Sequence, residues 1–425
     1  MRTRSQHKKE RRLAPRWSAA GAIAVSLSLV GGCAGGVGAG GGSGSDDDSA
    51  GLAPGATKEE YAEALAGMDP VTLTLQSTAS SADDVAAYRS NELKRSVEDL
   101  SDGKITIDVV YGPSIAAYTE VDSALADGRI DLAYMIPIYQ PQDYPAFSML
   151  AAGTGLVGTS PLTEELTINA AMLEVAYGTD ALFEEYEARG VTPLIPFNAT
   201  SSVMAMCTDA HESLEDWQGS VVSIGSQSTL AQAEALGATA TSLEYTETFE
   251  ALQRHVVDCS LATTLSATMT GLSEVAPHVA YSSTAGFARG AGAFVAGVDY
   301  ENLPLAARQL IFDQMGEAFK NSRRADLEGT HRLMEALAED GGSMHELDEA
   351  SSDAMVDSIH DIVDPALAEE IDTSMERWRT IVEELGYVDD GDFDTFPEWH
   401  DNTEEALDAY AERVYEELML SHRPE

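Results

Sequence analysis

The segment that decides the fold is DWQGSVVSIGSQSTLAQAEALGATATSLEYTETFEALQRHVVDCS, which spans Asp216–Ser260. Its first part contains a β-branched run between two glycines, Val221–Ile224, and this pattern predicts a short strand. Ser228 or Thr229 can then cap a helix over Leu230–Leu236, which a glycine ends. A second helical pattern, with apolar residues on one face, follows before the next strand. The segment therefore predicts two consecutive strand–helix units.

Units of this kind are typical of a parallel sheet, in which ligands bind outside the carboxyl ends of the strands. Ser223, Ser226 and Gln227 lie at or just after the end of the first predicted strand. We therefore expect these three side chains to face a ligand cleft. We add Ser260, which follows the second unit, to the candidate ligand contacts.

Two strands nearer the N-terminus provide further candidates. The alternating run Val71–Leu75 predicts a strand, and Ser77 and Thr78 follow at its carboxyl end. A later strand over Ile130–Tyr134 leads into a segment with three tyrosines and three prolines within residues 134–145. Either this segment packs as a rigid loop under the next helix, or it contacts a ligand at the strand ends. Its candidate ligand contacts are Tyr134, Met135 and Tyr139.

Several motifs occur in an order that resembles the solute-binding proteins of tripartite ATP-independent periplasmic (TRAP) transporters. The motifs are Asp216–Gly219, Ala235–Ala238, Glu247–Gln253, Val256–Asp258 and, earlier in the chain, Gly128–Asp131. The resemblance spans most of residues 70–330 and implies an α/β, two-lobed periplasmic-binding-protein-like fold of type II. Each lobe would be a mostly parallel sheet flanked by helices, with hinge crossovers between the lobes. It also implies a protein that captures a small polar solute and delivers it to a membrane permease, and that is not an enzyme.

The chain departs from the family pattern at one position. The family usually has an arginine near the end of the strand, which pairs with a substrate carboxylate, and here that position is Ser223. This departure from the family pattern therefore favours a neutral or weakly charged solute over a simple organic acid. If an acid is bound, Arg289 is the candidate cation, because its small neighbours leave room and an arginine suits bidentate pairing. A structural salt bridge is the alternative role of Arg289 in so acidic a chain.

The two lobes are expected to exchange segments of the chain. Lobe I comprises residues 58–200 plus 287–330, and lobe II comprises residues 201–286 plus 331–390. Residues 391–425 form a helical C-terminal extension, for which packing against the body of the protein is the default expectation.

The N-terminus has the pattern of an export signal, residues 1–33. A basic region precedes the apolar run Ala19–Val30, which is too short to span a bilayer. The run ends in small residues before Cys33, which resembles a bacterial lipoprotein cleavage site. Lipidation of Cys33 would anchor the protein to the outer face of the cytoplasmic membrane, whereas an ordinary secretory signal is the alternative. The Gly-, Ser- and Asp-rich residues 34–57 are predicted to form a flexible linker.

The charge balance restricts the partners. The chain has 25 basic and 72 acidic side chains, a formal net charge of −47. Cleavage before Cys33 removes seven of these basic residues and one acidic residue, which leaves 18 against 71 and a charge of −53. Such a protein repels the phosphates of nucleic acids, so nucleic acid is excluded as a partner. We expect a monomer.

Few other residues in the sequence indicate a disulfide, a metal site or a catalytic site. Cys207 and Cys259 are either bonded to each other or two buried free thiols, and an oxidising compartment makes the disulfide plausible. No histidines show the i, i+4 spacing of a metal site, and no nucleotide-binding or nucleophile-elbow motif occurs. We therefore expect no cofactor, no metal and no catalytic residue. The alternatives to a transport receptor are a sensor protein of the same fold and an extracellular hydrolase.

Overall fold

The computed structural model describes residues 51–388, 393, 396 and 406–425, all within one unit of the chain, Asp48–Glu425. The predicted signal with Cys33 lies outside these residues, as do most of the predicted linker and the start of the C-terminal extension. Within the described part of the chain, no helix combines the length and apolarity that crossing a bilayer requires.

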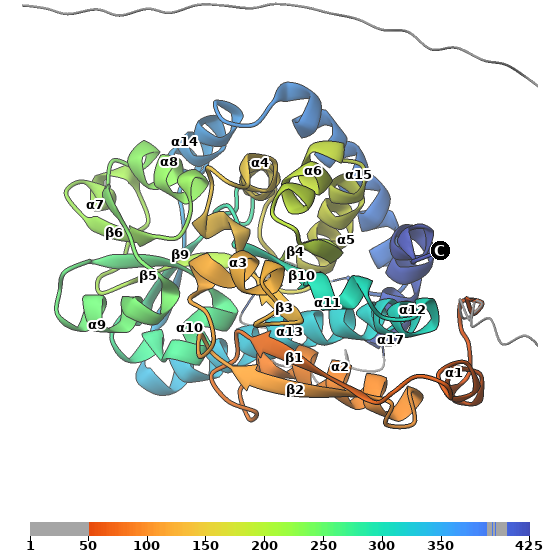
Figure 1. Cartoon of the computed structure of the whole chain (residues 1–425). Coiled ribbons are helices and arrows are strands. Elements are labelled where there is room, and N and C mark those ends of the chain that lie inside the picture. The colour runs from red at the N-terminus through yellow and green to blue at the C-terminus, as the bar shows by residue number, and fades with distance from the viewer. Residues whose placement is uncertain (1–50, 389–392, 394–395, 397–405) are drawn as a thin grey trace, which may run out of the picture. The chain divides into compact units, whose positions relative to one another are not determined.

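The first sheet has five strands in the order β2-β1-β3-β10-β4 (Figure 1). β1 pairs in parallel with β2 and β3, whereas β10 is antiparallel to β3 and β4. The alternating apolar residues of the predicted first strand, Leu73 and Leu75, are buried in its core. The strands are β1 (Val71–Ser77), β2 (Ile105–Tyr111), β3 (Leu132–Met135), β4 (Thr192–Ala199) and β10 (Ala291–Ala296).

The second sheet has six strands in the order β11-β9-β5-β8-β6-β7. β6 is parallel to β7 and β8, and β11 is parallel to β9, but β5 is antiparallel to both of its neighbours. The strands are β5 (Val203–Cys207), β6 (Val221–Ile224), β7 (Thr239–Ser242), β8 (Cys259–Thr263), β9 (His278–Tyr281) and β11 (Ser343–Glu346).

Both sheets are mixed rather than mostly parallel, because one strand in each arrives from the other sheet. The chain passes from β4 directly to β5 through residues 200–202, and from β9 to β10 through residues 282–290. A strand that enters in this way begins at the edge where the parallel strands end, so it runs against them. Residues 200–202 and 282–290 are thus crossovers of the kind that the resemblance implies between two α/β lobes, and each leads into an antiparallel strand.

Helices cover both sheets (Figure 1). Those packed mainly with the first sheet include α1 (Lys58–Ala64), α2 (Ala87–Leu100), α3 (Val121–Ala126), α4 (Pro145–Gly153), α5 (Thr163–Tyr177), α6 (Asp180–Ala188), α11 (Val298–Glu301), α12 (Leu305–Asp313) and α17 (Ala406–Val414). Those packed mainly with the second sheet include α7 (Leu214–Trp217), α8 (Gln227–Ala235), α9 (Thr248–Gln253), α10 (Thr264–Thr270) and α14 (Glu349–His360). Short 3₁₀ turns that matter for the site are η1 (Tyr118–Glu120), η2 (Pro137–Tyr139) and η4 (Tyr245–Glu247).

Two long helices alter the predicted lobe boundaries. α13 (Met315–Asp340) is continuous through residue 330, where we expected the chain to change lobe, and it contributes residues to the cores of both sheets. α15 (Pro365–Glu384) was expected in lobe II, but its buried Met375 and Trp378 belong to the core of the first sheet. The indole of Trp378 donates to the Glu174 carboxylate of α5 at 3.0 Å. An amphipathic helix pattern shows that one face is buried, but not against which partner.

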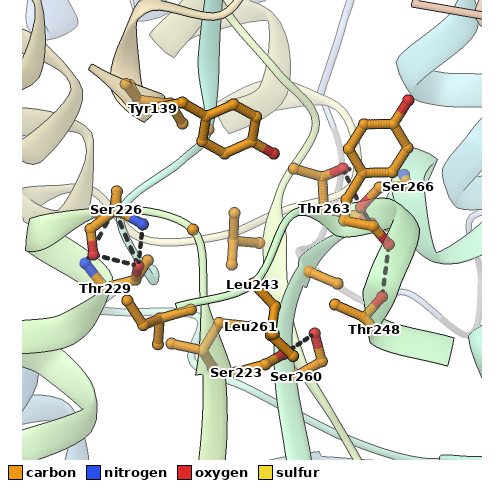
Figure 2. A pocket seen from close by; sticks show the side chains of 18 residues that line it. Tyr139, Ser223, Ser226, Thr229, Leu243, Thr248, Ser260, Leu261, Thr263 and Ser266 are labelled. Atoms are coloured by element: carbon orange, nitrogen blue, oxygen red, sulfur yellow. Dashed lines mark hydrogen bonds between the residues drawn. The ribbon is translucent and has the colours of Figure 1, made fainter. Parts of the chain in front are cut away.

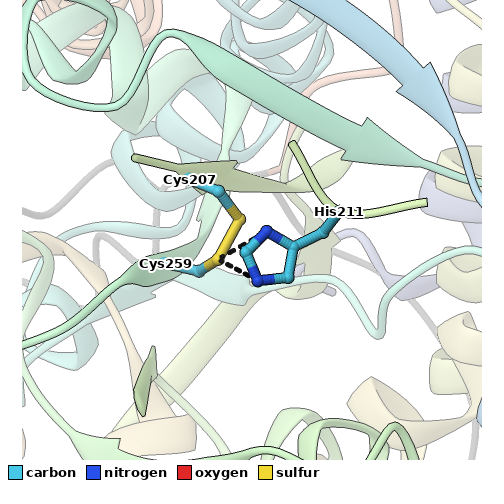
Figure 3. Close-up of side chains that lie close together, drawn as sticks. All are labelled: Cys207, His211 and Cys259. Atoms are coloured by element: carbon cyan, nitrogen blue, oxygen red, sulfur yellow. Dashed lines mark hydrogen bonds between the residues drawn. A yellow bond between two sulfur atoms is a disulfide. The ribbon is translucent and has the colours of Figure 1, made fainter. Parts of the chain in front are cut away.

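A disulfide joins Cys207 and Cys259, which the sequence left open (Figure 3). The two residues are directly paired across the antiparallel strands β5 and β8. His211 lies against the bridge, with its ring 3.8 Å from the Cys259 sulfur and 4.7 Å from the Trp217 ring between centroids. The bridge therefore fastens a crossover strand to the interior of the second sheet.

Candidate functional site

The first cavity lies between the ends of β6 and β8 and the turn η2, which follows β3 of the other sheet (Figure 2). It has a volume of about 80 Å³. Figure 2 shows Tyr139 on one side of the cavity and Ser223 with Ser260 on the opposite side. Because the wall is formed by residues of the turn after β3 together with residues of the second sheet, the cavity is an interlobe site.

Ser223 and Ser260 form the polar floor of this cavity. They are neighbours in the parallel pairing of β6 with β8, and the Ser223 hydroxyl donates to the Ser260 hydroxyl at 2.8 Å. Each is only 1% exposed, yet both line the cavity. The predicted strand end therefore presents two coupled hydroxyl groups and no positive charge.

The start of α8 forms one side of the same cavity. Ser226, rather than Ser228 or Thr229, caps this helix, and its hydroxyl accepts from the Thr229 amide at 3.2 Å. Ser226 and Thr229 line the cavity, so the sequence missed Thr229 as a wall residue. Gln227 is exposed and is absent from the wall, because the capped first turn points it away.

A second cavity of about 110 Å³ adjoins the first, and the two share wall residues such as Tyr139, Tyr245 and Thr263. Thr78, Tyr134 and Tyr139 line this second cavity among the predicted contacts. Most of its wall is apolar. The apolar and aromatic residues are Tyr134, Ile136, Ile138, Tyr139, Tyr245, Leu265, Met269 and Ala291.

Two predicted contacts near β1 and β3 lie beneath the cavities rather than in their walls. Ser77 is 2% exposed and its hydroxyl is hydrogen-bonded to that of Ser90 at 3.1 Å. Met135 is fully buried, with its sulfur 3.9 Å from the Tyr144 hydroxyl. Neither residue lines either cavity. The alternation of a strand explains this, because neighbouring side chains point to opposite faces of the sheet.

Arg289 has the structural role that the sequence analysis named as its alternative. Its guanidinium is ion-paired with the Glu165 carboxylate, and it also donates to the Thr200 carbonyl at 3.2 Å and the Ser202 hydroxyl at 3.1 Å. The side chain is 3% exposed and lines neither cavity, although its neighbours Ala288 and Gly290 do. Its guanidinium is thus held by Glu165 of α5 and by the crossover residues Thr200 and Ser202, so it is not placed to hold a solute.

The cation in the wall is instead Arg89, which the sequence analysis did not single out. It belongs to the first turn of α2 and lines the second cavity beside Thr78 and Tyr134. A signal was present in the sequence, because Arg89 falls near the apolar face that Leu93 and Val97 define by helical spacing. A cation on the apolar side of an amphipathic helix is either paired inside the protein or exposed to a ligand.

Tyr245 connects the two lobes across the second cavity. Its hydroxyl is hydrogen-bonded to that of Tyr118 at 3.0 Å and donates to the Thr78 carbonyl at 3.2 Å. Burial raises the pKa of the Tyr245 phenol, and burial likewise raises that of Tyr139. Both phenols therefore stay neutral and keep their protons for hydrogen bonding.

Comparison with known proteins agrees with this geometry. Residues 76–370 match the family model described as bacterial extracellular solute-binding protein, family 7. A search of curated proteins finds no match.

Solved structures of the same fold are numerous. A TRAP periplasmic solute-binding protein from Desulfovibrio salexigens with bound orotic acid is similar at a TM-score of 0.58 and 15% identity, over 74% of this chain and 97% of that one. An extracytoplasmic solute receptor from Bordetella pertussis that binds pyroglutamic acid has a TM-score of 0.59 and 16% identity, over 72% and 99%. A TRAP solute-binding protein from Rhodoferax ferrireducens with copurified benzoate has a TM-score of 0.58 and 11% identity, over 81% and 99%. At these identities the structures establish the shared two-lobed fold.

The matched segment covers more than half of the chain, and it includes the second sheet and, except for most of β1, the first. Members of this family are extracytoplasmic receptors that bind small ligands and work with membrane permease components, and they are not enzymes. The protein therefore belongs to family 7 of the bacterial extracellular solute-binding proteins, the solute receptors of TRAP transporters.

Proposed function

We propose that this protein captures one small solute in the two adjoining cavities between its lobes and delivers it to a TRAP permease. The observation that carries the proposal is the shared wall, in which Tyr139 from the turn η2 after β3 faces Ser223 and Ser260 of the second sheet. Such a site is complete only when the lobes are together, so solute binding and lobe closure are coupled.

The floor of the first cavity supports a solute that is uncharged on that side. Ser223 stands where the family usually has an arginine, and its hydroxyl is paired with that of Ser260. Two hydroxyls can donate to and accept from hydroxyl, carbonyl or amide groups, but they do not neutralise a carboxylate. We propose that this end of the site holds a neutral polar group.

We further propose that a lipid on Cys33 tethers the receptor to the outer face of the cytoplasmic membrane. The support is the apolar run followed by small residues and a cysteine in the sequence. A tether of Gly, Ser and Asp residues would let the receptor reach a permease in the same membrane.

Transport is the direct test of the proposed function. Mass spectrometry of the gently purified protein should reveal one retained solute, and that solute should enter proteoliposomes containing the cognate permease only when this protein is added. Uptake that is independent of the protein would contradict the proposal, and so would a protein that retains no solute and is stabilised by none.

We expect Tyr245→Phe to weaken solute binding about 10-fold, because about 1.4 kcal/mol is typical of losing hydrogen bonds that only the closed form makes. The lost bonds are those to Tyr118 and Thr78 across the lobes. Since closure traps the solute, the change should increase its dissociation rate more than it lowers its association rate. Stopped-flow measurements on the purified protein separate the two rates.

Tyr111→Phe is the matched control for Tyr245→Phe. Its hydroxyl donates to the Asn91 side chain at 2.7 Å within the first lobe, so the same atom is removed without affecting any contact between lobes. Equal effects of the two substitutions on the dissociation rate of the solute would show that the Tyr245 hydrogen bonds do not hold the lobes closed around it.

A further inference from the structure

Arg89 is a buried cation without a carboxylate partner. Its side chain is 5% exposed, and among the described residues no carboxylate oxygen lies within 4.0 Å of its guanidinium. One of its terminal nitrogens donates to the Thr78 hydroxyl at 2.5 Å, and its Nε is buried without any hydrogen-bond partner. Burying a charge without a partner is costly, so such an arrangement points to a missing ligand.

The scarcity of such arginines in this chain strengthens the argument. Acidic side chains outnumber basic ones by 72 to 25 in the full sequence, so a nearby carboxylate is easily supplied. The two other buried arginines each have one: Arg289 pairs with Glu165, and Arg323 lies 2.9 Å from the Asp326 carboxylate. Among the described residues, Arg89 at the wall of a cavity has no carboxylate within ion-pairing distance.

The buried charges around the crossovers have an excess of one positive charge. The charged side chains buried there are Arg89, Arg289, Arg323, Glu165 and Asp326. Burial raises the pKa of the Asp326 carboxyl, and the positive charges of Arg323 and then Arg89 oppose this rise. Three cations therefore face at most two carboxylates, and one bound negative charge would balance the set.

The other residues of the second cavity indicate the size and polarity of the uncharged part of such a ligand. The Arg89 guanidinium carbon lies 3.8 Å from the centroid of the Tyr134 ring, which fixes the guanidinium plane from one side. Apolar side chains, among them Ile136, Leu265 and Met269, form most of the rest of the wall. A dry apolar cavity of roughly 150 Å³ holds a benzene ring, so the 110 Å³ here suit a small ring or a branched chain.

We propose that Arg89 is the anion-binding residue of this receptor and that its solute is a small monocarboxylate with a compact apolar or aromatic body. This inference rests on the proposed function, because it names the solute class of the same site. The carboxylate binds the free edge of the Arg89 guanidinium, the body lies against Tyr134 and Tyr139, and a neutral polar group reaches Ser223 and Ser260 through the shared wall. Dicarboxylates bind poorly, since their second charge faces the uncharged floor.

The test compares acids with their neutral amides on the purified protein after its retained solute has been removed by unfolding and refolding. The probes are benzoate, 3-hydroxybenzoate, phenylacetate and cyclohexanecarboxylate, the four corresponding amides, and succinate. By isothermal titration calorimetry, at least one monocarboxylate should bind roughly 100-fold more tightly than its amide and than succinate. Binding of none of the acids, or equal binding of acid and amide, would overturn the inference.

Substitutions then assign the effect to Arg89. R89Q should lower the affinity for the acid roughly 100-fold and leave that for the amide nearly unchanged, whereas R89K should keep part of the preference for the acid. R129Q is the matched control, because Arg129 is exposed and pairs only with Asp127 on the surface. Acid binding that persists in R89Q, with the thermal unfolding midpoint of the wild type, would overturn the assignment.

The failure of this inference can be distinguished from failure of the proposed function. If mass spectrometry finds a neutral retained solute that the permease then takes up, the receptor function stands and the assignment of Arg89 falls. If no solute is retained or transported at all, the function itself falls.

Discussion

Glu165→Gln should destabilise the protein by about 3–5 kcal/mol, the usual consequence of removing one partner from a buried ion pair. Glu165 is 3% exposed on α5 and is ion-paired with Arg289, while its other carboxylate oxygen lies 3.7 Å from Arg323. Glutamine preserves the shape of the side chain but leaves two buried guanidinium groups without their shared anion. Urea unfolding followed by circular dichroism measures the change.

Glu63→Gln is the control for this substitution. Glu63 is exposed on α1, where a single surface change is expected to alter stability by at most about 0.5 kcal/mol. The double variant Glu165→Gln with Arg289→Gln should recover part of the loss, because the anion and one of its cations are removed together. A loss for Glu165→Gln no larger than that for Glu63→Gln would show that the buried pair is not formed.

Replacing both Cys207 and Cys259 by alanine should destabilise the protein by about 4 kcal/mol, the value expected from chain entropy for a loop of this size. The bridge closes a sequence separation of 52 residues and joins the crossover strand β5 to β8. Without it, the unfolded chain gains freedom, while the folded state keeps the same strand pairing. The free energy of unfolding should therefore fall with little change in the circular dichroism spectrum of the native protein.

A reductant provides the control for the disulfide. Dithiothreitol should lower the thermal unfolding midpoint of the wild type towards that of the double alanine variant, and it should not change the variant itself. A wild type that is insensitive to dithiothreitol even when incubated near its unfolding midpoint would contradict a stabilising bridge. A variant that responds to the reductant would show that some other group is responsible.

Much of the architecture could be predicted because the signals are local. The β-branched run Val221–Ile224 between glycines forms β6 with the predicted bounds, and the helix after it forms as α8. The helix is capped by Ser226 rather than by the predicted Ser228 or Thr229, because several hydroxyl side chains in a row can each accept from the first amides of a helix. Ser223 lines a cavity near the carboxyl end of β6, and the rule that ligands bind at the carboxyl ends of parallel strands is what made it a candidate contact.

The predictions were wrong where partners come from distant parts of the chain. Arg289 and Glu165 are 124 residues apart, and no local pattern shows that they meet. Contacts between distant segments also determine the packing of α15 against the first sheet and the antiparallel direction of β5 and β10. These features depend on how the chain crosses between the lobes, and hydrophobic periodicity does not predict such crossings.

By itself, the sequence determined the α/β class and the resemblance to TRAP receptors, and it put a serine at residue 223, at the end of a predicted strand. These follow from strand and helix periodicity, turn residues and motifs within short segments. Only the tertiary structure decided which arginine is paired and which is left at the cavity. Ion pairing and burial are set by contacts between segments far apart in the chain, so Arg289 is paired with Glu165, whereas Arg89 lies at a cavity wall with an unpartnered Nε.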